Sequence, residues 1–186
     1  MKSSHVKASV ASYFRYKKQC PLITFERPLK HNMGQPDILV ITKNRKIVEV
    51  EVKVSLSDFK NDTKKKIWNY RSKLPDLYPM PYQFYYAVPE KLKDKALAVM
   101  EAWDKQGLIN GRVGLMIVID RVNIGWGDVE VVKKCPINKK SYELSTKDMV
   151  KIVKDQTGTL CSCMVKIAKM ENNRYFSYMF QDGQGI

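Results

Sequence analysis

The sequence predicts one mixed α/β domain, and three features of the chain support this prediction. Residues 37–42 and 46–54 have the composition of strands, and the short polar segment between them indicates a hairpin. Residues 3–14 and 90–106 carry apolar side chains at helical spacing. A further strand is expected at residues 82–88. Strands and helices therefore mix along the chain, as in proteins with a sheet flanked by helices.

One helix and one strand are expected before the hairpin. Ser3 and Ser4 are suited to cap the first helix, which is expected to end near Pro21. Residues 22–27 form a short apolar stretch and predict the first strand.

After the hairpin, a basic helix is expected with Ser55 or Ser57 at its cap and its end near Tyr70. Gly107 is expected to end the helix at residues 90–106. A buried strand at residues 114–120 completes the order α-β-β-β-α-β-α-β, and residues 129–133 are expected to add an edge strand. We assign residues 1–134 to a core and residues 135–186 to a helical C-terminal extension of the same domain.

The charge of the chain points to a class of partner. Its 33 Lys and Arg residues exceed its 19 Asp and Glu residues, and the formal net charge is +14. A field of this sign attracts polyanions such as nucleic acid, although solubility alone is an equally simple explanation.

Cysteine use and hydropathy predict a cytoplasmic, intracellular protein that is not associated with a membrane. Four scattered cysteines are too few for a disulfide framework in a chain of this size. The longest apolar run, residues 113–119, is too short to cross a bilayer. The sequence leaves open whether the gene is cellular or belongs to a phage or mobile element.

The segment from Glu49 to Lys53 contains candidate catalytic residues. Successive side chains of a strand point to opposite faces, so Glu49, Glu51 and Lys53 share one face. If the hairpin turn is centred on Asn44, Asp37 lies opposite Glu51, with Cβ atoms roughly 5 Å apart.

Two carboxylates at that separation repel each other unless a cation lies between them. A hard divalent ion such as Mg²⁺ prefers oxygen ligands, and the Lys53 ammonium can stabilise charge on a phosphate undergoing attack. The competing interpretation is an amphipathic strand whose Glu and Lys residues form weak surface pairs. Asp37 argues against it, because an acid at the head of an apolar strand contributes little to folding.

Pro36-Asp37 followed by Glu51-Val52-Lys53, within this order of elements, resembles the PD-(D/E)XK nuclease superfamily. The likeness is greater to the MmcB-type DNA-repair-associated proteins. In those proteins too, the motif lysine is followed by a helix with the pattern Ser-x-x-Asp-Phe, which here is residues 55–59. An aromatic strand that ends in Ala-Val-Pro comes later, and here it is residues 84–89. The likeness to these proteins covers about residues 4 to 120.

The resemblance implies a restriction-endonuclease-like αβββαβ core, with a central mixed sheet flanked by helices. The C-terminal helical appendage is expected from the residues after Ser145 themselves. The resemblance also implies a Mg²⁺ or Mn²⁺ cofactor bound by Asp37, Glu51 and the Val52 carbonyl, with Lys53 as the catalytic lysine. Many members add a glutamate from the first helix, but no acid precedes Glu26 here. Glu26 or Glu49 is the alternative ligand, and Glu26 is equally explained as a surface residue.

Lysines of the helix after the motif are candidates for positioning a phosphate backbone, although a solvated helix face would look the same. They are Lys60, Lys64 and Lys65.

Three functions compete on these residues. The first is a metal-dependent DNA endonuclease or exonuclease, a hydrolase of phosphodiester bonds, acting in repair, recombination or defence. The second is a non-catalytic nucleic-acid-binding module on the same fold, and the third is a basic structural protein. The sequence leaves open whether the partner is DNA or RNA and whether the chain forms a homodimer.

Overall fold

The computed structural model describes residues 1–26, 35–64, 80–120, 127–158, 160–162 and 164. The chain divides into two compact units, Met1–Ser145 and Thr146–Ile186. In the second unit, residues 146–158 are helical. Within the described residues, no helix is both long enough and apolar enough to cross a membrane.

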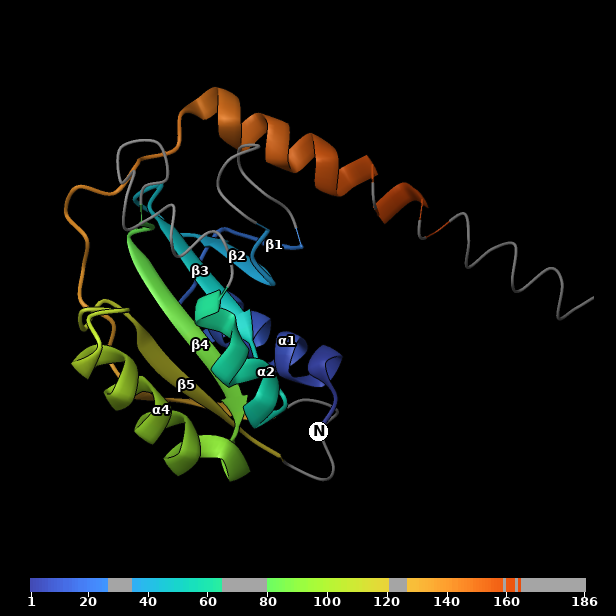
Figure 1. Cartoon of the computed structure of the whole chain (residues 1–186). Coiled ribbons are helices and arrows are strands. Elements are labelled where there is room, and N and C mark those ends of the chain that lie inside the picture. The colour runs from blue at the N-terminus through green and yellow to red at the C-terminus, as the bar shows by residue number, and fades with distance from the viewer. Residues whose placement is uncertain (27–34, 65–79, 121–126, 159, 163, 165–186) are drawn as a thin grey trace, which may run out of the picture. The chain divides into compact units, whose positions relative to one another are not determined.

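The first unit contains a six-stranded mixed sheet flanked by helices, as predicted (Figure 1). Its elements in chain order are α1 (Ser3–Ser12), η1 (Tyr13–Lys17), β1 (Leu22–Phe25), β2 (Ile38–Ile41), β3 (Ile47–Val52), α2 (Leu56–Asn61), η2 (Asp62–Lys64), β4 (Gln83–Pro89), η3 (Glu90–Leu92), α4 (Lys93–Lys105), β5 (Gly114–Ile119) and β6 (Asp128–Lys133).

The strands lie in the sheet in chain order, from β1 to β6. The pairs β1–β2, β2–β3 and β5–β6 are antiparallel, whereas β3–β4 and β4–β5 are parallel. The predicted hairpin register is confirmed, because Ile38 pairs with Val50 and Ile41 pairs with Ile47. The predicted edge strand is confirmed as β6.

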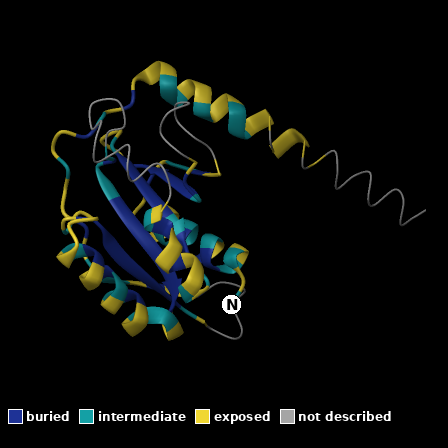
Figure 2. Ribbon diagram, viewed as in Figure 1, coloured by how far each residue is buried: buried dark blue, intermediate teal, exposed yellow. Residues whose placement is uncertain are grey.

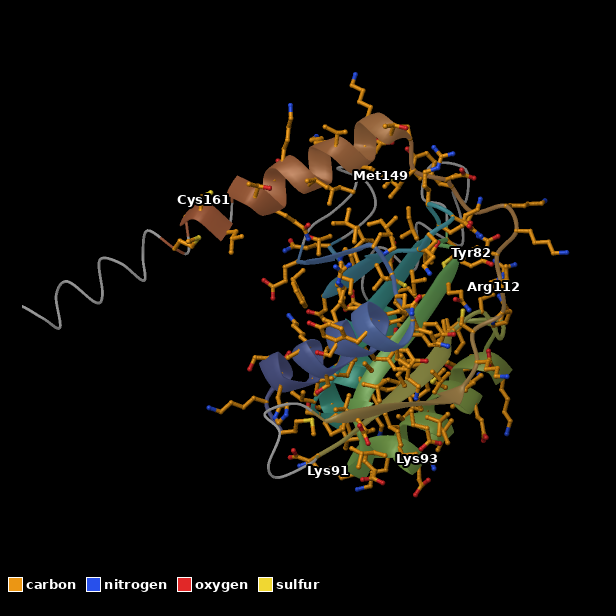
Figure 3. The ribbon with its side chains drawn as sticks, turned by 180° about the vertical axis from the view of Figure 1, so that it is seen from behind. Tyr82, Lys91, Lys93, Arg112, Met149 and Cys161 are labelled. Atoms are coloured by element: carbon orange, nitrogen blue, oxygen red, sulfur yellow. The ribbon has the colours of Figure 1, made fainter. Side chains whose placement is uncertain are left out.

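Two hydrophobic cores lie on opposite faces of the sheet. On one face, Val6, Val10 and Phe14 pack against β3 residues that include Val48 and Val50. Burial of such apolar side chains stabilises the fold by roughly 1.5–3 kcal/mol each. Figure 2 shows the strands as the buried layer, and Figure 3 shows α1 in front of this face.

The second core is aromatic and lies under α2 and α4. Phe59 from α2 stacks on Trp103 from α4, with ring centroids 5.0 Å apart. Tyr86 from β4 is tilted against Phe59, with centroids 4.8 Å apart. The aromatic residues of β4 are therefore mainly core residues, and Phe84, Tyr85 and Tyr86 are all buried.

The helix ends agree only in part with the sequence predictions. Ser55 is the cap of α2, because its side chain accepts a hydrogen bond from the Asp58 N–H. Gly107 ends α4 in a left-handed conformation, with φ +69°. The first helix differs, since it begins at Ser3 and the cap position belongs to Lys2, which makes no side-chain cap bond.

Candidate functional site

The site residues gather at one end of the sheet. Because β2 runs antiparallel to β3 and β4 runs parallel to it, the start of β2 and the ends of β3 and β4 lie together. Asp37 directly precedes β2, and Lys53 directly follows β3. Lys91 and Lys93 follow β4, and Figure 3 places them at the opposite end of the sheet from Tyr82.

The Asp37 side chain is hydrogen-bonded to the backbone of β3, the strand that contains Glu51 and Val52. The Val52 N–H donates a hydrogen bond to Asp37 Oδ2 over 2.8 Å. The paired residues of β2 and β3 end at Ile38 and Val50. The Asp37 side chain therefore accepts a hydrogen bond from β3 just beyond the last backbone pair. The Asp37 carbonyl also accepts a hydrogen bond from the Glu26 N–H over 3.2 Å.

Lys7 of α1 joins Asp37 to Glu26. Its ammonium lies 2.8 Å from Asp37 Oδ1 and 2.6 Å from Glu26 Oε1. Burial acts to lower the pKa of Lys7, but hydrogen bonds to Asp37 and Glu26 and their charges outweigh it, so this pKa is raised. The two carboxylates therefore share one cation. Glu26, the ligand candidate in the first strand region, lies one residue after β1 and beside Asp37.

Lys53 occupies a second, separate cluster under α2. It is 3% exposed. Its ammonium lies 2.7 Å from Asp62 Oδ1, 3.6 Å from Glu51 Oε2 and 3.7 Å from Asp58 Oδ1. Only the Asp62 contact has hydrogen-bond length.

Asp62 is buried between Lys53 and the aromatic core. It is 2% exposed, and the Tyr86 hydroxyl donates a hydrogen bond to its second oxygen, Oδ2, over 2.6 Å. Asp58 is the exposed member of this cluster, with 56% of its side chain accessible.

The structure brings the predicted residues to one end of the sheet but divides them into two clusters. Continued by one residue beyond the Ile38–Val50 pair, the hairpin register sets Asp37 opposite Glu51. The Asp37 carboxylate nevertheless contacts Lys7 and the Val52 backbone, whereas the Glu51 carboxylate contacts Lys53. Glu49, the other ligand candidate, is 3% exposed and lies between Leu39 and Phe84 in the sheet.

The predicted phosphate-positioning lysines follow the motif strand. Lys60 at the end of α2 and Lys64 in η2 are exposed. Lys65 lies outside the described residues.

Four residues of these clusters were not predicted from the sequence: Lys7, Asp58, Asp62 and Tyr86. A signal existed for the two aspartates. They are four residues apart in the segment after Lys53, and residues at this spacing share one helical face. Lys7 gave no such signal, because its role depends on how α1 packs on the sheet.

The donor atoms of the site suit a hard cation, but their present contacts are with ammonium groups. Carboxylate oxygens of Asp37 and Glu51 and the carbonyl of Val52 are the oxygen ligands that Mg²⁺ prefers. Among the described residues, however, no group of three His, Cys, Asp or Glu side chains is arranged to hold a metal. Lys7 and Lys53 supply the positive charge in this arrangement.

The fold and site define a basic α/β protein with carboxylates and lysines at one end of a mixed sheet. No protein-family model matches the chain, and no curated protein matches it. A solved structure of a protein of unknown function from Silicibacter pomeroyi is similar, with a TM-score of 0.51 and 17% sequence identity. The match covers 100% of this chain and 97% of that chain. At this identity the likeness shows a shared fold.

Proposed function

We propose that this protein is a divalent-metal-dependent nuclease with a restriction-endonuclease-like PD-(D/E)XK core, which hydrolyses phosphodiester bonds in DNA. The observation that carries the proposal is the 2.8 Å hydrogen bond from the Val52 N–H to Asp37 Oδ2. It holds the acid before β2 against the backbone between Glu51 and Lys53. An aspartate with a purely solvated role does not need this connection.

The site residues have distinct tasks in such a reaction. Asp37, Glu51 and the Val52 carbonyl are the proposed ligands of Mg²⁺ or Mn²⁺, with Glu26 as the additional acid beside Asp37. A bound metal supplies Lewis-acid polarisation of the phosphate and of an attacking water. The Lys53 ammonium stabilises negative charge that develops on the phosphate oxygens. Attack by water requires no covalent intermediate with the protein.

Charge and position support DNA as the substrate. Lys60 and Lys64 are exposed on the segment that follows Lys53, and Lys91 lies exposed beyond the end of β4. Lys91 lies at the end of the sheet at which the acids gather, and Lys60 and Lys64 lie on the segment that follows Lys53. Their charges attract a phosphate backbone toward this part of the protein. The net charge of +14 strengthens the attraction. Repair, recombination and defence are the processes that use such an activity.

The test is cleavage of plasmid, single-stranded and branched DNA with Mg²⁺ or Mn²⁺, comparing the wild type with Asp37→Asn. Asparagine retains an oxygen acceptor for the Val52 N–H but removes the charge. The matched control is Glu101→Gln, at an exposed position of α4. Metal-dependent cutting by the wild type and the control, with loss in Asp37→Asn, supports the proposal. Equal cutting by all three contradicts it.

A second function, a non-catalytic nucleic-acid-binding module, is favoured by one specific observation. Asp37 and Glu51 each contact a lysine ammonium, and those contacts neutralise charge without any metal. This module would bind DNA with the salt dependence expected of phosphate contacts and would not cut it. Calorimetric titration with Mg²⁺ separates the two functions independently of activity, since only the nuclease requires metal binding that weakens in Asp37→Asn.

A further inference from the structure

Asp62 is a buried acid that the proposed reaction does not use. Its side chain is 1% exposed, and burying a carboxylate is costly unless it is paired and hydrogen-bonded. One of its oxygens is ion-paired and the other accepts a hydrogen bond. Oδ1 faces the Lys53 ammonium at 2.7 Å, and Oδ2 accepts the Tyr86 hydroxyl hydrogen bond at 2.6 Å.

The Tyr86 hydroxyl is itself held in place by the core. Tyr86 is fully buried and lies beside Glu51 in the parallel register between β3 and β4. Its ring contacts Phe59 and Trp103, with centroid separations of 4.8 and 5.9 Å. A buried aromatic cluster therefore surrounds the ring whose hydroxyl donates to Asp62.

The three carboxylates near Lys53 are not equivalent. Asp62 is at hydrogen-bond distance, whereas the nearest oxygens of Glu51 and Asp58 are 3.6 and 3.7 Å from the ammonium. Asp62 is also buried, so water competes with it much less than with the exposed Asp58. Of the three carboxylates, Asp62 therefore makes the shortest and most buried contact with the ammonium.

We propose that Asp62, oriented by Tyr86, is the positioning residue that holds the Lys53 ammonium beside Glu51. This inference rests on the proposed function for its catalytic consequence. It adds a part of the site that lies outside the acid-acid-lysine motif. Asp62 touches neither substrate nor metal in this account, and it acts through Lys53.

The first test measures the position of Lys53 directly and needs no activity. The full-length protein is treated with trace acetic anhydride, and mass spectrometry compares acetylation of Lys53 with that of exposed Lys105. In the wild type, Lys53 reacts much more slowly than Lys105. In Asp62→Asn, loss of the charged partner releases the amine, and its relative labelling is expected to rise about tenfold or more.

The second test measures catalysis with the same variant. Misplacing a group that stabilises the transition state lowers kcat by about tenfold or more and leaves KM nearly unchanged. The matched control is Asp104→Asn, which breaks another Asp–Lys pair, to Lys133 at 2.9 Å, away from this cluster. This control is expected to keep both the wild-type kcat and the slow labelling of Lys53.

Tyr86→Phe keeps the test decisive if Asp62→Asn does not fold. It removes only the hydroxyl from a buried ring, and it is expected to raise Lys53 labelling and lower kcat by smaller factors. Faster labelling with a lower kcat in either variant supports the proposal. Unchanged labelling, or faster labelling with an unchanged kcat, overturns it. Faster labelling in a protein whose wild type cuts no DNA overturns the proposed function while supporting the positioning of Lys53 by Asp62.

Discussion

Lys7 of α1 and Asp37 before β2 form an ion pair, with Nζ 2.8 Å from Oδ1. The Lys7 ammonium is therefore paired with a carboxylate oxygen that the proposed metal site requires. We expect Lys7→Met to raise the affinity for Mg²⁺ several-fold, because it removes a positive charge that competes for Asp37. Isothermal titration calorimetry measures the change.

The control for Lys7→Met is Lys105→Met, at an exposed position of α4. This control is expected to bind Mg²⁺ as the wild type does. Unchanged or weaker binding by Lys7→Met would show that Lys7 does not compete with metal at Asp37.

Comparing Asp37→Ala with Asp37→Asn separates the structural role of Asp37 from its charge. Asp37→Ala removes the acceptor of the buried Val52 N–H and is expected to cost about 1–3 kcal/mol in the free energy of unfolding. Asp37→Asn retains an oxygen acceptor and is expected to cost less than about 1 kcal/mol. Urea unfolding of both variants checks this difference. Equal costs would mean that the hydrogen bond contributes nothing to stability.

Exposed lysines beside the site are expected to contact phosphates. In Lys60→Ala/Lys64→Ala, we expect weaker DNA binding and a slope of log K against log salt that is smaller by about 1–2. Lys105→Ala, with an exposed lysine on α4, serves as the control. Fluorescence anisotropy over a series of salt concentrations gives the slopes. Identical slopes for the double variant and the wild type would place the DNA elsewhere.

The ion pair between Asp104 and Lys133 makes stability depend on pH. Burial acts to raise the pKa of Asp104, but hydrogen bonds from Lys133 and the Gly111 N–H, and the Lys133 charge, hold this pKa below its usual value. Because the folded-state pKa is lowered, the pair stabilises the protein above the usual aspartate pKa of about 4 and loses this effect as pH falls further.

Asp104→Asn is therefore expected to lower the free energy of unfolding at neutral pH, by about 1 kcal/mol or less for a partly exposed pair. Its difference from the wild type should shrink below about pH 4. Urea unfolding at several pH values measures this, with Glu101→Gln as a control. A difference that is constant with pH would show that the charge of Asp104 is not the cause.

The order of elements and the hairpin register were predictable from the sequence because both depend on local patterns. Strand periodicity and a short polar turn place Ile38 opposite Val50, and Gly107 supplies the left-handed residue that ends α4. These features need no knowledge of distant contacts.

The arrangement of the site was less predictable because it depends on packing between distant segments. Lys7 reaches Asp37 only because α1 packs on the sheet at that end. The basic composition after Lys53 predicted a phosphate-positioning helix surface, yet Asp62 is buried in that segment and forms an ion pair with Lys53. The division into two clusters follows from these contacts.

The central claim, that Lys53 serves phosphodiester hydrolysis, is tested most directly by measuring cleavage and DNA binding together for Lys53→Met and Lys105→Met. Methionine keeps much of the apolar stem of Lys53 and removes its ammonium, and thermal melting checks that the variant is folded. We expect Mg²⁺-dependent cutting by the wild type and Lys105→Met, and DNA binding without cutting by Lys53→Met. Binding without cutting by all three proteins would contradict the nuclease and support the binding module.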